Sequence, residues 1–363
     1  MLKIIMNWIE VRIGLKDLVR THLTEYPVPK NINIFYTLGF VALAGFVVQT
    51  MTGFLLLVYY VPLPEYAFKS VQNIMANVPY GWLFRLMHVV GSNLIVVAVG
   101  SHLLSVFFMN SYKKPRELTW FVGALMLLIT LTFCLSGYLL PWSQLSYWAT
   151  TIVTNIPSAL PYIGALVVAC LQGGQSVSGF TLGRFFALHV VVLPALLLAL
   201  ISIHIFLIRR MGISSPPFGR EGEKKPWTSF RHEDHPGGNP FFPHFVLKET
   251  YMVMAFFAVM FSIITFAPAL FLPDDANMPA DPFKTPAHIK PEWYFLAPYQ
   301  MLKLVPNKLL GLSLQTIIVT LLILWPFLDV KQEDNLLKRR ALFALFLAAI
   351  VGWVVLTIWG KYS

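Results

Sequence analysis

The chain has 363 residues, of which 57% are hydrophobic and only 12% are charged, and its formal net charge is +10. So apolar a composition excludes an ordinary soluble domain and indicates a protein that crosses a membrane several times. Its two cysteines, Cys134 and Cys170, form no metal-ligand pattern, and we interpret them as structural thiols.

Several stretches are long and apolar enough to span a bilayer as helices. They cover residues 33–60, 81–109, 117–140, 184–208, 250–272, 309–328 and 341–359. The sequence therefore predicts an all-α polytopic membrane protein with seven spans, in which a four-helix bundle precedes three further helices. We divide the chain into an amphipathic arm (1–32), a four-helix domain (33–210), a connection (211–249) and a C-terminal three-helix domain (250–363).

Basic residues gather in the N-terminal arm and in the connections after the second, fourth and sixth spans. Cytoplasmic loops near membrane ends carry an excess of Lys and Arg, so we expect these four segments and the N-terminus on the cytoplasmic side, with the arm on the lipid surface. Residues 141–183, between the third and fourth spans, contain no Lys, Arg, Asp or Glu. This bias explains the net charge, and we expect no nucleic-acid partner.

Two of the predicted spans carry two histidines each. His88 and His102 are fourteen residues apart, which at about 100° per residue is 40° short of four turns, so they share a face and lie roughly 21 Å apart. His189 and His204, fifteen residues apart, return within about 60° of one face and lie roughly 22 Å apart. Because the two spans run parallel, His88 should face His189 near the outer surface, and His102 should face His204 near the inner one.

Ionisable groups inside lipid are costly and usually mark function. A lone histidine in a span is more often a hydrogen-bonded polar residue, but this repeated spacing suits two flat macrocycles between helices, with bis-imidazole ligation of haem b iron. Two other classes stay open at this point. A dihaem anchor of a dehydrogenase also needs four histidines but not the last three spans, and a proton-coupled transporter gives no reason for the spacing.

Further residues fit the same interpretation. Arg85 and Arg184 precede the outer histidines, where a buried cation needs an anionic partner such as a haem propionate, unless it reaches the interface. Small residues on the first and third spans provide either close helix packing or room for a porphyrin edge; they are Gly39, Gly45, Gly53, Gly123 and Gly137.

A second constellation lies outside the membrane before the sixth span. Glu292 and Tyr294 belong to a Pro-Glu-Trp-Tyr segment, and Tyr138 and Trp142 end the third span on the same side. An aromatic pocket with one carboxyl group could form there beside the outer histidines. A carboxylate whose pKa is raised by desolvation suits taking a proton from a hydroxyl whose electrons leave for a haem.

At these residues the chain resembles the cytochrome b/b6 family, the haem-bearing core of quinol-oxidising cytochrome bc complexes. The resemblance covers nearly the whole length. Its motifs read GWLFRLMH, KKPRELTW, GYLLPWSQ, TLGRFFALH and ADPFKTPAHIKPEWYFLAPYQML. It implies two non-covalent b haems, the outer one held by His88 and His189 and the inner one by His102 and His204. It also implies that Arg85 and Arg184 bind propionates.

The resemblance further implies that Glu292, Tyr294 and Tyr138 line an outer quinol-oxidation site. One electron from quinol would pass to a Rieske-type iron–sulphur protein and on to a c-type cytochrome subunit. The other would cross through both haems to an inner quinone-reduction site, which contributes to proton translocation. The uncharged outer connection would dock the iron–sulphur protein. We expect a homodimer within a quinol:cytochrome c or plastocyanin-type oxidoreductase, in an energy-transducing cytoplasmic membrane of bacterial type.

Several positions depart from the family pattern. The fifteen-residue histidine spacing matches the b6 type, which ends after the fourth span, and the last three spans resemble its separate subunit, so the chain reads as a fused version. Thr37 stands where the b6 type has the cysteine of an extra haem, which argues against a covalent third haem. Ser105 replaces a common arginine near the inner haem, and Arg209 is the expected substitute. His232 and His235, in a polar loop without further ligands, receive no role.

Overall fold

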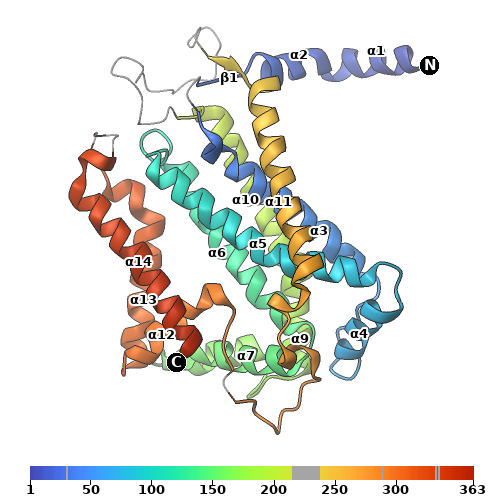
Figure 1. Cartoon of the computed structure of the whole chain (residues 1–363), viewed down its shortest axis with the longest axis vertical. Coiled ribbons are helices and arrows are strands. Elements are labelled where there is room, and N and C mark those ends of the chain that lie inside the picture. The colour runs from blue at the N-terminus through green and yellow to red at the C-terminus, as the bar shows by residue number, and fades with distance from the viewer. Residues whose placement is uncertain (30–31, 215–237, 288, 332, 334–335) are drawn as a thin grey trace.

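The computed structural model describes residues 1–29, 32–214, 238–287, 289–331, 333 and 336–363. Within these residues, 7 helices are long and apolar enough to cross a membrane, which confirms the predicted all-α fold and the number of spans. The long helices are inclined to one another and pass between the two ends of an elongated bundle (Figure 1). The chain is an integral membrane protein. His232 and His235 lie outside the described residues.

The first four spans form the bundle that carries the histidines. Helix α3 (Leu38–Leu57) packs along α5 (Gly81–Phe108), and α6 (Glu117–Leu139) packs along the fourth span. The fourth span is a composite of α9 (Gly179–Ala187), a π-helical turn η4 (Leu188–Val192) and α10 (Leu193–Met211). It begins five residues before the predicted start, at a capping box in which Ser178 and Thr181 satisfy backbone N–H groups.

The last three spans pack on this bundle from two sides. Helix α11 (Val246–Phe266), which follows the π-helical turn η6 (Phe241–Phe245), lies against α3 and α5. Helix α13 (Lys308–Leu328) lies against α6, and α14 (Arg340–Tyr362) packs on the short α12 (Leu296–Leu304). The fifth span ends at Phe266 rather than at the predicted residue 272, because Pro268 has no N–H to extend the helix.

The predicted basic segments meet at one end of the bundle, which we call the basic end. The N-terminal arm forms α1 (Leu2–Ile13), α2 (Leu15–Val19) and the π-helical η1 (Arg20–Thr24), which project sideways from this end (Figure 1). A two-stranded antiparallel sheet joins β1 (Pro27–Val28) to β2 (Asn239–Pro240). Arg116 donates to the carbonyl of Gly212 at 3.0 Å, and Lys113 donates to that of Lys331 at 2.8 Å. These contacts link all four segments, whereas the membrane side that they face stays a prediction.

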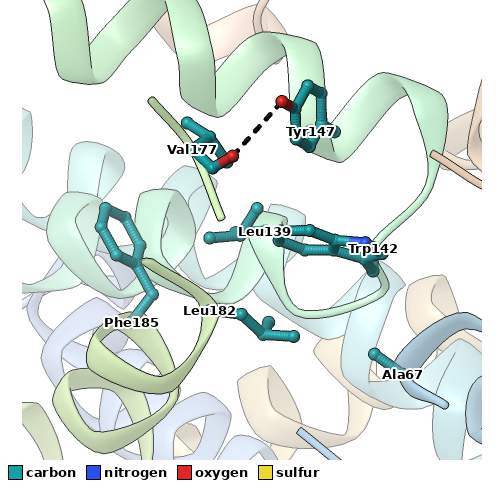
Figure 2. Packing of buried hydrophobic residues seen from close by; sticks show 7 residues of the cluster. All are labelled: Ala67, Leu139, Trp142, Tyr147, Val177, Leu182 and Phe185. Carbon is teal, nitrogen blue, oxygen red and sulfur yellow. Dashed lines mark hydrogen bonds between the residues drawn. The ribbon is translucent and has the colours of Figure 1, made fainter. Parts of the chain in front are cut away.

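The opposite end, which we call the outer end, contains α4 (Ala67–Asn77), α7 (Gln144–Asn155) and α8 (Gly164–Gln172). Short 3-10 turns complete the fold: η2 (Ile34–Thr37), η3 (Ile156–Ala159), η7 (Pro268–Phe271), η8 (Asp274–Asn277), η9 (Trp293–Phe295) and η10 (Leu336–Lys338). A buried apolar cluster fixes α7 to the ends of α6 and α9; Figure 2 shows its members, Ala67, Leu139, Trp142, Tyr147, Val177, Leu182 and Phe185.

Trp142 belongs to this cluster and not to the predicted aromatic pocket. Its indole packs edge-on against Tyr147 with the ring centroids 5.5 Å apart, and its side chain is almost fully buried (Figure 2). The backbone of Trp142 has a φ of 53°, a left-handed conformation that turns the chain sharply after α6. This turn directs the indole into the core beside α7.

The segment after the fifth span is held against the start of α7, chiefly by the side chain of Gln144. Gln144 donates to the carbonyl of Lys284 at 3.1 Å and accepts from the backbone N–H of Asp281 at 2.9 Å. Ser143 pairs with Pro279 as an isolated antiparallel bridge. These contacts fix the long outer segment against α7, and the same segment continues into the turn that carries Glu292.

Candidate functional site

The structure brings the two outer histidines together, one from α5 and one from η4. The ring centroids of His88 and His189 are 6.3 Å apart and the rings are inclined at 73°. Two imidazoles that share one metal ion at metal–nitrogen distances of about 2 Å have centroids about 6 Å apart. The separation therefore matches a pair of imidazoles on either side of one iron ion.

Hydroxyl groups select the tautomer of both rings. Thr52 donates its hydroxyl hydrogen to the carbonyl of Val48 at 2.7 Å, so its oxygen accepts from Nδ1 of His88 at 2.9 Å. Ser136 donates to the carbonyl of Phe133 at 3.1 Å and likewise faces Nδ1 of His189 at 3.0 Å. With hydrogen on Nδ1, the lone pair of each neutral imidazole lies on Nε2, the nitrogen that remains available to a metal.

The inner histidines also come together, toward the basic end. His102 and His204 are partly buried and close enough to interact electrostatically. Nδ1 of each ring is buried without a hydrogen-bond partner among the described residues. His204 also interacts with the backbone of Thr119, whereas a buried imidazole nitrogen without a partner, as on His102, is costly unless the ring binds something.

One glycine lies against each of the four imidazoles. A Cβ on Gly53 would lie 3.3 Å from Cε1 of His88, and one on Gly137 would lie 2.6 Å from Cε1 of His189. Toward the basic end, a Cβ on Gly39 or Gly123 would lie 3.0 or 3.2 Å from Cε1 of His102 or His204. At Gly137 a larger residue would force the ring or the helix to shift, and at the other three glycines the ring would have to give by a few tenths of an ångström. Gly45, predicted with this group, instead lies against Ile95 and Phe256 and serves helix packing.

The π-helical turn η4 explains how unequal spacings give matched pairs. His189 lies in this turn, which inserts one extra residue into the helix. The fifteen residues from His189 to His204 therefore advance about as far in angle as the fourteen from His88 to His102. Pro194, just after the turn, has no N–H for the carbonyl four residues earlier and so favours the wider winding.

A cavity of about 300 Å³ opens beside the outer pair, and we call it the main cavity. His88 and His189 line it together with Gly53 and Gly137. Glu292 and Tyr294 line the same cavity, as does the third predicted residue of the pocket, Tyr138. One cavity thus connects the outer imidazoles with the carboxyl group. Such a cavity, mostly apolar with a few polar groups, is typical of a ligand site.

Glu292 is the carboxyl group among the residues that line this cavity. Burial raises the pKa of its carboxyl, and an interaction with the Tyr138 hydroxyl, a hydrogen-bond donor, opposes this only in part. Burial also raises the pKa of Tyr294 well above its ordinary value, and the neighbouring Cys134 and Glu292 raise it further. Tyr294 therefore stays protonated, whereas Glu292 can exchange a proton nearer neutral pH.

The two predicted propionate arginines lie in different places. Arg85 is partly buried and lines the main cavity. Arg184 is exposed and donates to the carbonyls of Ala169 and Cys170, which places it at the C-terminal end of α8. A cation there stabilises the free carbonyls of the helix end. In this structure Arg85, and not Arg184, is directed to the main cavity.

The remaining predicted positions lie toward the basic end. Arg209 stacks on the rings of Tyr26 and Phe241, 4.3 and 4.9 Å from their centroids, and donates to the carbonyl of His22 at 3.2 Å. Thr37 is fully buried, and its hydroxyl donates to the carbonyl of Ile34 at 2.6 Å. Ser105 donates to the carbonyl of Phe35 at 3.0 Å. Each hydroxyl hydrogen is thus already used in a hydrogen bond to the backbone and cannot be donated to a ligand.

Some site residues escaped the sequence reasoning. Gly39 lies fourteen residues before Gly53, as Gly123 lies before Gly137, and this spacing is the signal that assigns Gly39 to His102. Thr52, Ser136 and Cys134 carried no comparable signal, because hydroxyl and thiol groups in spans usually bond to their own helix.

Together these residues fit haem. The outer pair has the separation of two ligands of one metal ion, both of its Nε2 atoms are available, and a glycine lies against each of the four imidazoles. The chemistry of the donor set is that of bis-histidine iron ligation.

Two family models match the chain. One, described as "Cytochrome b/b6/petB", matches residues 23–212, and the other, described as "Cytochrome b(C-terminal)/b6/petD", matches residues 279–363. The first covers the bundle with all four histidines, and the second covers the segment with Glu292 and the last two spans.

Individual proteins agree with these matches. The chain is 38% identical over 325 residues to "Cytochrome b" of Rickettsia prowazekii, covering 90% of this chain and 78% of that one. It is 35% identical over 346 residues to "Cytochrome b" of Rhodospirillum rubrum, covering 94% and 82%. A solved structure titled "Hyperthermophilic respiratory Complex III" superposes with a TM-score of 0.89 at 38% identity, covering 98% and 91%. The chain therefore belongs to the cytochrome b family of membrane-embedded electron-transfer proteins.

Proposed function

We propose that this chain is the haem-bearing, quinol-oxidising core subunit of a bc-type respiratory oxidoreductase complex. The observation that carries the proposal is the main cavity, which is lined by His88 and His189 and also by Glu292 and Tyr294. A quinol bound in this cavity would lie beside both the proton acceptor Glu292 and the outer pair of histidines.

Four residues would hold the two haems. His88 and His189 would ligate the outer haem through Nε2, and His102 and His204 would ligate the inner one. When bound, the two b haems supply one-electron transfer across the membrane, and neither needs a covalent bond to the chain. Gly53, Gly137, Gly39 and Gly123 keep the imidazole edges free of side chains, and Arg85 would neutralise a propionate of the outer haem.

The chain's own residues then handle the protons. Conversion of a quinol to a quinone releases two electrons and two protons. The Glu292 carboxylate would accept one proton from a quinol hydroxyl, and its raised pKa makes it basic enough to hold that proton. The second proton would be released to water at the outer end. Tyr138 would orient the carboxylate through its hydroxyl, and Tyr294, which stays protonated, would offer a hydrogen-bond donor to the quinol.

Partners follow from the same assignment. A Rieske-type iron–sulphur protein would take the first electron and pass it to a c-type cytochrome, and its docking surface would be the uncharged outer connection with α7 and α8. A second quinone would be reduced near Arg209, close to the inner pair. We infer a homodimer within the complex, and an orientation with the basic end in the cytoplasm, because positive charge is retained on that side.

Quinol-driven reduction of the b-type absorbance in the purified complex tests this proposal. We expect added quinol to reduce both haems and an inhibitor of the outer site together with one of the inner site to abolish the reduction. Complex that binds two haems but takes electrons from a dehydrogenase subunit and not from quinol would support the dihaem-anchor alternative. Colourless complex would exclude both functions and leave the transporter alternative.

A further inference from the structure

A hydrogen bond ties the turn with Glu292 directly to the helix with His88. The indole Nε1 of Trp293 donates to Oδ1 of Asn93 at 2.9 Å, across 200 residues of sequence. Asn93 lies on α5, five residues after His88, with 4% of its surface exposed, and it lines the main cavity. A buried polar contact between two separate parts of the chain restricts their relative position.

The partners of Asn93 fix the orientation of its amide. Nδ2 donates to the carbonyl of Val89 at 3.0 Å, one helical turn earlier. The indole N–H is a donor only, so it requires the oxygen of the amide. Because a carbonyl on one side and an indole on the other both constrain it, the amide cannot flip without losing both bonds. Asn93 is a rigid connector between α5 and the turn.

Trp293 transmits this constraint to both of its neighbours. The turn η9 is closed by a hydrogen bond from the N–H of Phe295 to the carbonyl of Glu292 at 2.8 Å. Trp293 lies between Glu292 and Tyr294, and its ring packs on that of Tyr294 with centroids 5.3 Å apart. In so short a turn a shift of the indole moves the carboxyl group and the phenol together.

We propose that Asn93 is a positioning residue for quinol oxidation. It holds the proton-accepting turn at a fixed place relative to the helix that bears the outer iron ligand, so that a quinol meets both groups in one pose. Reaction rates depend steeply on such placement. The inference rests on the proposed function and adds to it a specific residue outside the PEWY segment.

Two single variants and their combination test it in the whole complex. Asn93→Leu keeps the approximate volume and removes both bonds, and Trp293→Phe removes the indole donor. Each should lower kcat/KM for quinol roughly three- to tenfold, the range of one hydrogen bond. The double variant should lose about as much as the more impaired single variant, because Asn93→Leu already removes the bond that Trp293→Phe removes. Haem content and the rate of the inner-site reaction, measured with the outer site blocked, should stay at the wild-type level.

Trp120→Phe is the matched control. Its Nε1 donates to the carbonyl of Leu322 at 2.8 Å, which also joins an N-terminal helix to a C-terminal one, but it does not line the main cavity. Trp120→Phe should leave kcat/KM for quinol unchanged.

Wild-type kcat/KM in either single variant, or losses that multiply in the double variant, would overturn the proposal. If Asn93→Leu does not assemble with haem, Trp293→Phe decides alone. Failure of the proposed function would give a different result from failure of this proposal, because the wild-type complex itself would then not take electrons from quinol.

Discussion

The backbone of Gly137 touches the imidazole of His189 so closely that an added Cβ would lie 2.6 Å from Cε1. Real Cβ atoms do not approach other atoms so closely, so either the ring or α6 must move. We expect Gly137→Ala to displace His189 and to reduce the outer haem content to less than half. Reduced-minus-oxidised spectra of the purified complex, together with its haem content per chain, measure this loss.

Gly100→Ala on α5 is the control for this substitution. An added Cβ there meets no heavy atom within 4 Å, so both absorption bands should persist. Equal spectra for Gly137→Ala and Gly100→Ala would contradict the role of Gly137.

The histidine pairs predict the number and the attachment of the haems. A pyridine haemochrome assay should give two b haems per chain, and a haem-stained denaturing gel should show none bound to the polypeptide, because Thr37 provides no thiol. His102→Leu should abolish one of the two absorption bands. His22→Leu, an exposed histidine of the N-terminal arm, should leave both. A stained band at the mass of the chain would disprove non-covalent binding.

Regular geometry explains why much of this could be predicted from sequence. Hydropathy over long windows defines the spans, and the fourteen-residue step places His88 and His102 on one face without any tertiary information. The second and fourth spans are separated by one span and therefore run parallel, so each histidine pairs with the one at the same depth on the other helix. These inferences depend only on the helical repeat and on the bilayer thickness.

Local irregularities are what the sequence did not reveal. The π-helical turn at His189 removes the difference of about 100° that regular geometry leaves between the two histidine spacings. The left-handed backbone of Trp142 turns its indole away from the cavity. Gly39 and Gly45 are equivalent by composition, and only packing distinguishes the one against His102 from the one against Ile95. For Arg184 the sequence left a propionate or the membrane interface open, and only the structure shows its contact with the carbonyls at the end of α8.

Glu292 predicts the pH dependence of quinol oxidation. Only the carboxylate can accept a proton, and burial raises the pKa of Glu292, so activity should rise with pH through that raised pKa. Glu292→Gln has the same shape but accepts no proton, so it should lower kcat by about tenfold or more and remove this acid limb. Stopped-flow haem reduction at a series of pH values measures both effects.

Glu65→Gln is the control, because Glu65 is an exposed acid at the same end, and it should keep the wild-type profile. An unchanged acid limb in Glu292→Gln would show that another group titrates.

Two cysteines report the orientation of the chain. Cys170 is exposed at the outer end, whereas Cys134 is partly buried within α6. A membrane-impermeant maleimide added to intact cells should therefore label Cys170 and not Cys134. Cys170→Ser should abolish the labelling, and Cys134→Ser should retain it. Labelling of Cys170 only in inverted vesicles would place the outer end in the cytoplasm.

A buried ion pair predicts how pH affects stability at the basic end. Arg339 donates two hydrogen bonds to Asp329, at 2.6 and 2.5 Å, and Tyr112 donates a third at 2.6 Å. Burial alone would raise the pKa of Asp329, but these bonds and the charges of Arg339 and Lys113 hold it below its ordinary value. A lowered pKa in the folded state stabilises the fold above the ordinary pKa of about 4 and ceases to do so as the pH falls through the folded pKa.

Asp329→Asn should therefore destabilise the complex at pH 7 by about 3 kcal/mol, the lower end for breaking a buried pair, since 12% of the Arg339 side chain stays exposed. The thermal midpoint of helical circular dichroism in detergent should drop at pH 7, and the difference from wild type should shrink below about pH 4. Asp17→Asn is the comparison, because its 3.0 Å pair with Arg20 is exposed and should contribute nothing measurable. A difference between wild type and Asp329→Asn that grows toward acid pH would have the wrong sign, and would show that Asp329 is protonated in the folded chain at neutral pH.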